Sequence, residues 1–92
     1  MILAAMLTFS IASATFNAGA TMPKSTVYNK YGCTGGNGSP ELHWSGAPKG
    51  TRSFALIAHD PDAPARGGWY HWVVYNVPAS TARFAMGVKL PD

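Results

Sequence analysis

The sequence predicts an all-β fold, an antiparallel β-sandwich, and three observations lead to that prediction. Glycine, proline, asparagine and serine recur between short apolar pieces over residues 21–50, which is typical of strands joined by frequent turns. Two later runs, residues 53–60 and 69–77, are rich in β-branched and aromatic residues. The sequence has no internal repeat and no heptad pattern, so a single domain is expected.

Residues 1–20 are expected to form a signal peptide. The run from Met1 to Phe16 carries no charge and consists of apolar and small hydroxyl residues, and Ala18-Gly19-Ala20 fits a small-residue cleavage site. The usual basic start is absent, and the run is short for a transmembrane span. A buried helix is the alternative, but the segment has no polar face for it. This predicts a mature chain in the periplasm or outside the cell.

Residues 21–92 are expected to be the N-terminal part of a larger domain. A chain of that size buries little apolar surface and is marginal without disulfides, metals or a partner. Cys33 is the only cysteine, so no disulfide can form within the chain. Unfinished sheets expose strand edges, so we expect association with other chains and no cooperative unfolding of a monomer.

The charge distribution argues against nucleic acid as a partner. Seven Lys and Arg face four Asp and Glu, which gives a formal net charge of +3. The basic residues are scattered, whereas a phosphate backbone calls for a basic stripe on one element. Membrane contact is expected to be peripheral at most.

Three segments are expected to be strands. In the first, residues 41–45, Leu42 and Trp44 share one face and His43 takes the other. The second, residues 53–60, is apolar on both faces, which suits a strand inside a sandwich. In the third, residues 69–77, alternation predicts one common face for five side chains: Trp69, His71, Val73, Tyr75 and Val77.

A site for a small anion is expected where the last two strands meet. Asp60 and Asp62 stand at the end of one strand and His71 near the start of the next, while Trp69 and Trp72 supply apolar walls. A neighbouring carboxylate favours the protonated imidazole, which can hold an anion. The alternative is structural, because Asp-Pro-Asp is common in turns and a single histidine on an aromatic strand is usually half-buried.

Other chemistries have weaker support. A zinc site from His43, His59, His71 and Asp60 lacks the usual ligand spacing. The glycines of residues 35–38 are not followed by the Lys-Ser/Thr pair of a phosphate loop, and the serines have no nucleophile-elbow frame. No metal and no cofactor are therefore expected.

Four motifs in order resemble the phosphatidylethanolamine-binding protein family, in its bacterial Raf-kinase-inhibitor-like branch. They are residues 33–51, with Ser-Pro-Glu-Leu-His-Trp inside, residues 53–56, Asp-Pro-Asp-Ala-Pro at 60–64, and Gly-Trp-Tyr-His-Trp at 68–72. The family continues with a Gly-Pro-rich segment and a His-Arg-Tyr motif that this sequence does not contain.

The resemblance implies a two-sheet sandwich whose pocket binds phosphate, phosphoethanolamine-like head groups or acetate. Asp60 and His71 match the pocket carboxylate and histidine of the family, Asp62 the second motif aspartate, and Pro64 and Trp69 the wall. It also implies a cis bond between Ala63 and Pro64.

The first functional hypothesis is a non-enzymatic module that binds anions or phospholipid head groups and modulates or inhibits another protein. Two alternatives stay open. One is a hydrolase with His71 as general base and Asp60 as its orienting group, and the other is a truncated gene product without function of its own.

Overall fold

The computed structural model describes residues 8–90, and the regular secondary structure in this range is almost wholly strand, with long irregular segments between the strands. Its elements are β1 (Ser10–Ala12), the 3₁₀ turn η1 (Lys24–Thr26), β2 (Leu42–Ser45), β3 (Ser53–Asp60), β4 (Trp69–Pro78) and β5 (Arg83–Phe84). All strand pairs are antiparallel, which confirms the predicted all-β class. In the described range, no helix has the length and hydrophobicity to cross a membrane.

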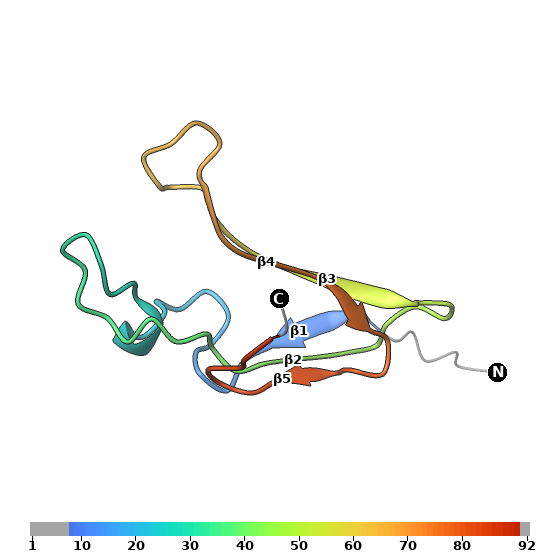
Figure 1. Ribbon diagram of the computed structural model, residues 1–92. Coiled ribbons are helices and arrows are strands. Elements are labelled where there is room, and N and C mark those ends of the chain that lie inside the picture. The colour runs from blue at the N-terminus through green and yellow to red at the C-terminus, as the bar shows by residue number, and fades with distance from the viewer. Residues whose placement is uncertain (1–7, 91–92) are drawn as a thin grey trace. The chain divides into compact units, whose positions relative to one another are not determined.

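The described residues divide into two compact units, residues 8–48 with 82–90 and residues 49–81. The first unit holds a three-stranded sheet in the order β1-β2-β5, with β2 in the middle (Figure 1). Trp44 of β2 is paired with Ile11 of β1, and Leu42 is paired with Phe84 of β5.

A small aromatic core supports this sheet. Trp44 and Phe84 are buried, and their rings meet edge to face with centroids 5.3 Å apart. Along β2, Leu42 and Trp44 are less exposed than His43 and Ser45, as the alternation of the sequence predicts.

The structure does not support a signal segment that ends at Ala20. Residues 10–12 form β1 and pair with β2, and residues 13–15 make hydrogen bonds to Glu41. Phe9-Ser10-Ile11-Ala12 alternates large and small side chains, which suits a strand as well as it suits an apolar export signal. Cleavage after Ala20 would remove β1 from its sheet. Residues 1–7 of the expected segment lie outside the described range.

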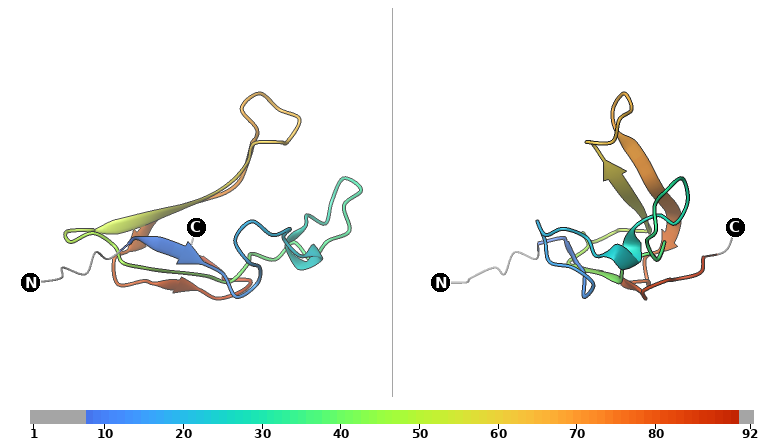
Figure 2. Two further views of the ribbon diagram at one scale, coloured as in Figure 1. Left: turned by 180° about the vertical axis from the view of Figure 1, so that it is seen from behind. Right: turned by 90° about the vertical axis from the view of Figure 1, so that its left-hand side faces the viewer.

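The second unit is one long hairpin of β3 and β4 that carries the loop of residues 61–68 at its end (Figure 2). Its pairing is regular in the middle, where Ile57 faces Val73 and Ala58 faces Trp72. The register shifts twice, between Phe54 and Leu56 and between Ala58 and His59.

Each shift leaves an extra residue on β4, and the prediction of one common face for five side chains of this strand is therefore wrong. The first extra residue is Asn76, at a left-handed φ of 55°. It reverses the alternation, so Val77 is 4% exposed whereas Tyr75 is 73% exposed. The second is His71, beside the candidate site.

The expectation of a cis bond between Ala63 and Pro64 is wrong as well, because the described chain holds only trans peptide bonds. The loop is reversed by its two glycines instead. Gly67 and Gly68 have φ values of 78° and 81°, a region that other residues adopt at a cost.

Candidate functional site

The expected carboxylate and imidazole do meet in the hairpin. Asp60 ends β3 and is paired with Trp69, the first residue of β4, so His71 of β4 lies close by. The distance from Nε2 of His71 to Oδ2 of Asp60 is 3.4 Å, which confirms the predicted approach. Both side chains are about half exposed. An exposed ion pair of this kind contributes little to the stability of the fold, so we consider it as a possible ligand site.

Asp60 also stabilises a turn, which is the structural role that the sequence analysis gave as the alternative to ligand binding. The backbone N–H of Asp62 donates a 3.0 Å hydrogen bond to Oδ1 of Asp60 and closes a turn. One carboxylate oxygen thus orders the start of the loop, and the other faces His71. The turn role and the site role are compatible, since they use different oxygens.

Two further residues, His59 and Gly68, hold the loop in roles that the sequence analysis did not assign to them. Nε2 of His59 lies 2.8 Å from the carbonyl oxygen of Gly67, and the imidazole stacks on the ring of Tyr70 at 4.4 Å between centroids. A Cβ on Gly68 would lie 2.3 Å from the main-chain oxygen of Asp60, so only glycine fits there without a shift. The sequence carries a signal for both roles, because His59 directly precedes Asp60 and the pair Gly67-Gly68 ends the loop.

The remaining predicted site residues belong to the loop and to the start of β4, and they are open to solvent. Asp62 and Pro64 are exposed in the loop, and Trp69 is 56% exposed. The candidate site in the second unit therefore consists of the Asp60–His71 pair and of solvent-exposed residues close to it in the sequence.

A metal centre has no support in residues 8–90, where no group of three or more His, Cys, Asp or Glu could hold an ion. His43, one member of the zinc alternative, is engaged elsewhere. Its Nδ1 lies 2.9 Å from Oε1 of Glu41.

Glu41 is the centre of a second polar cluster, in the first unit, that the sequence did not reveal. Its carboxylate is buried and receives the N–H of Ala14 at 2.8 Å and Nε of Arg83 at 2.9 Å, besides His43. The hydrogen bond from Ala14 holds the pKa of Glu41 below its usual range, against the opposing effect of burial, with His43 and Arg83 lowering it further. This cluster ties residues 13–15, β2 and β5 together.

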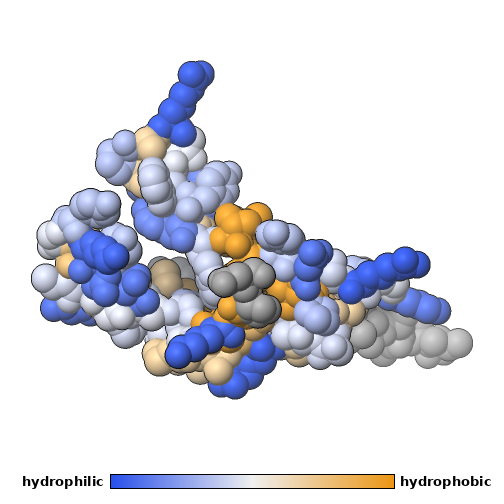
Figure 3. Space-filling view, viewed as in Figure 1, coloured by the Kyte–Doolittle hydropathy of each residue, from blue (hydrophilic) through white to orange (hydrophobic). Residues whose placement is uncertain are grey.

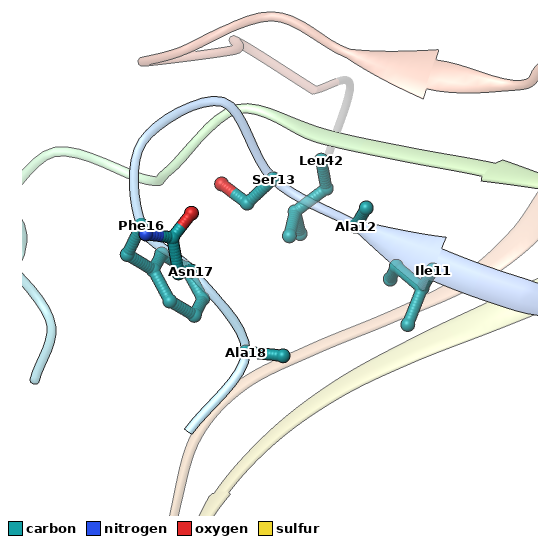
Figure 4. A pocket seen from close by; sticks show the side chains of 7 residues that line it. All are labelled: Ile11, Ala12, Ser13, Phe16, Asn17, Ala18 and Leu42. Atoms are coloured by element: carbon teal, nitrogen blue, oxygen red, sulfur yellow. The ribbon is translucent and has the colours of Figure 1, made fainter. Parts of the chain in front are cut away.

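A shallow pocket of about 370 Å³ also lies in the first unit. Side chains of β1, of the loop that follows it and of β2 line it: Ile11, Ala12, Ser13, Phe16, Asn17, Ala18 and Leu42 (Figure 4). The wall is mostly apolar and carries no charged residue. Sequence reasoning missed it because six of its seven residues fall in the expected signal segment.

The second unit combines antiparallel strands, an Asp-Pro-Asp loop and a histidine beside it, which are among the motifs that resemble the phosphatidylethanolamine-binding proteins. The family model described as "Phosphatidylethanolamine-binding protein" matches residues 12–92. The chain belongs to this family.

Among its relatives, the UPF0098 proteins YbcL and YbhB of Escherichia coli K12 are similar to this chain. YbcL is 43% identical over 100 aligned residues, which cover 95% of this chain and 55% of YbcL. YbhB is 44% identical over 79 residues, 80% of this chain and 50% of YbhB.

Solved structures agree with this assignment. The crystal structure of YbcL, described as a member of the mammalian PEBP family, matches with a TM-score of 0.82 at 44% identity and covers 86% of this chain and 48% of that one. A homolog from Chlamydia trachomatis gives a TM-score of 0.78 at 32% identity, over 91% of this chain and 54% of the homolog. The chain thus spans about half the length of the relatives it matches.

Proposed function

We propose that this protein is a non-enzymatic module that binds small phosphate-type anions, with a phosphoethanolamine-like head group as the preferred class. The observation that carries the proposal is the imidazole of His71 held against Asp60 at the loop end of the hairpin. Membership of the phosphatidylethanolamine-binding family supports the same class of ligand.

The hydrogen-bond geometry of His71 specifies how an anion would bind. For Nε2 to donate to Asp60, that nitrogen must carry a hydrogen. In the neutral ring Nδ1 is then an acceptor and repels an anion. Only the protonated ring offers a second N–H, and Asp60 is the hydrogen-bond partner found for the His71 side chain among residues 8–90. An anion at Nδ1 would therefore bind the ring that carries hydrogens on both nitrogens.

Asp60 leaves room for an anion at the other ring nitrogen. The carboxylate lies at Nε2, so an anion at Nδ1 would be separated from it by the width of the imidazole. The charge-assisted N–H bond that results is about twice as strong as a neutral one.

The wider role forms part of the proposal. The complete domain would be an antiparallel β-sandwich of the family type, would act in the periplasm or outside the cell, and would modulate or inhibit another protein. The TM-score of 0.82 against YbcL supports the fold. The localisation is proposed from the uncharged, apolar start of the sequence alone, since residues 10–12 of that start form β1 and do not fit a segment cleaved after Ala20.

A hydrolase is the second candidate, because an Asp60-oriented His71 also has the arrangement of a general base. The two roles differ in outcome. A binding module returns phosphoethanolamine unchanged, a hydrolase releases phosphate, and a functionless truncated product gives no saturable binding.

Replacing His71 with alanine is expected to weaken binding of phosphoethanolamine by about ten- to a hundredfold, since a hydrogen bond to a charged group contributes roughly 1.5–3 kcal/mol. His43→Ala is the matched control, because His43 is similarly exposed but bonds to Glu41 in the other unit. Isothermal titration calorimetry at pH 6 measures both. Equal affinities in the two variants would show that His71 is not part of the site.

A further inference from the structure

The loop of residues 22–38, drawn in teal in Figure 1, presents two aromatic rings to solvent. We call this segment the tyrosine loop. Tyr31 is 95% exposed and Tyr28 is 43% exposed, and the centroids of their rings lie 6.2 Å apart with 31° between the ring planes. The first unit therefore offers a pair of aromatic side chains on one loop, outside the core around Trp44.

Hydrogen bonds within the loop hold its backbone in place. The N–H of Gly35 donates to the carbonyl oxygen of Tyr28 at 3.0 Å. The N–H of Gly36 donates to the carbonyl oxygen of Lys24, also at 3.0 Å. A Cβ on Gly35 would lie 2.2 Å from the main-chain oxygen of Val27, so the two arms of the loop approach closely. Side chains on a loop that is already folded lose less freedom when they bind a partner.

Tyr31 stands at the tip of a tight turn that does not favour it. The N–H of Cys33 donates to the carbonyl oxygen of Lys30 at 3.0 Å, and Tyr31 and Gly32 between them have φ values of 53° and 85°. Positive φ at both central residues defines a type I′ turn, in which asparagine, aspartate or glycine is usual. A bulky side chain adopts this φ at a cost. The exposed tyrosine is therefore explained better by a contact outside the chain than by the stability of the turn.

The charges of the loop are all of one sign. Lys24 and Lys30 are both exposed, and the first acidic residue of the sequence is Glu41. Among residues 8–90, neither lysine forms an ion pair. The two ammonium groups beside the tyrosines thus favour a partner with a negatively charged surface.

The other exposed side chains of the loop favour a bilayer over a nucleic acid. Met22 and Val27 are 43% and 42% exposed, and apolar groups add affinity for lipid but not for a phosphate backbone. Tyrosine is enriched at the head-group level of membranes, and lysine is attracted to anionic lipids. Figure 3, in the view of Figure 1, shows this part of the chain mostly in blue, pale blue and white. A surface of that polarity suits the head-group layer rather than the hydrocarbon.

We propose that the tyrosine loop binds the surface of an anionic phospholipid bilayer. The rings of Tyr28 and Tyr31 lie at the level of the head groups, and Lys24 and Lys30 face the lipid phosphates. The interaction does not depend on the anion site, since His71 belongs to the other unit and the loop recognises a charged surface rather than a single head group. The two proposals can fail separately.

The test is sedimentation of the chain with vesicles at an ionic strength of about 0.01 M, where surface charges are little screened. We expect the partition coefficient to be roughly tenfold higher for phosphatidylcholine vesicles that contain phosphatidylglycerol than for phosphatidylcholine alone. His71→Ala should partition like the unchanged chain.

Two lysines in the loop should matter more than two elsewhere. Lys24→Gln with Lys30→Gln should lower the partition coefficient on the anionic vesicles roughly tenfold. Lys49→Gln with Lys89→Gln is the matched control, because it removes the same charge from two exposed positions outside the loop. This control should change the partition coefficient less than about twofold.

The role of the aromatic tip is tested by Tyr31→Asn, in which asparagine keeps the positive φ of the turn. The loop should stay folded, and binding to the anionic vesicles should fall at least about threefold. Tyr75→Thr is the control, since it removes an exposed tyrosine from a strand of the other unit and should leave binding unchanged.

Three results would overturn the proposal. The first is equal sedimentation with both kinds of vesicle, and the second is an equal loss of binding in the two lysine pairs or in the two tyrosine variants. The third is binding of a single-stranded oligonucleotide that Tyr31→Asn abolishes while no vesicle is bound, which would assign the loop to nucleic acid.

Discussion

Replacing Phe84 with alanine is expected to remove the ordered structure of the three-stranded sheet. Phe84 is 5% exposed and packs edge to face on Trp44, and truncation of a buried phenylalanine costs about 3–5 kcal/mol. The described residues hold only three buried hydrophobic side chains, so little else can compensate. The near-ultraviolet circular dichroism of the aromatic pair should be lost.

The neighbouring Met86 provides the control. It is 56% exposed in the same unit, and its replacement by alanine should change stability by less than about 0.5 kcal/mol. A variant with alanine at 84 that kept the full near-ultraviolet signal would contradict the role of this aromatic pair.

Acid is expected to loosen the same sheet through Glu41. The folded-state pKa of Glu41 is lowered, chiefly by the Ala14 N–H and then by His43 and Arg83. The ionised carboxylate therefore stabilises the folded chain above its ordinary pKa near 4.5, and this contribution is lost as the pH falls through the lowered value. Strand β1 should detach first, because Ala14 lies only two residues after its end.

Glu41→Gln removes the charge but keeps the shape. Exchange protection of the Ala14 amide at pH 6 should be about tenfold lower in this variant, since a charged acceptor binds more strongly than a neutral one. Nuclear magnetic resonance at several pH values should then show no acid step at Ala14, whereas Asp62→Asn should retain it. An acid step of unchanged size in Glu41→Gln would show that another group causes it.

The local features of the hairpin could be predicted from sequence, and the irregular ones could not. Runs of β-branched and aromatic residues ended by prolines located β3 and β4 almost to the residue. The meeting of Asp60 with His71 followed from the antiparallel pairing. The two bulges were missed because the position of an extra residue such as Asn76 depends on the pairing with the opposite strand. The alternation of side chains within one strand contains no information on that pairing.

Contacts between distant segments account for the other errors. The partners of Glu41 lie 27 residues before it at Ala14 and 42 after it at Arg83, so no local pattern marks this carboxylate as buried. Residues 10–12 were assigned to a signal segment because their composition fits both uses. Only the pairing of β1 with β2 distinguishes them.

The most direct test of the anion-binding proposal is a titration of the ¹⁵N-labelled protein with phosphoethanolamine at pH 6, followed by nuclear magnetic resonance. We predict saturable shifts of the His71 ring nitrogens and of the amides of residues 60–68, and their loss in His71→Ala. Shifts that are absent there, or that persist unchanged without the imidazole, would contradict the site.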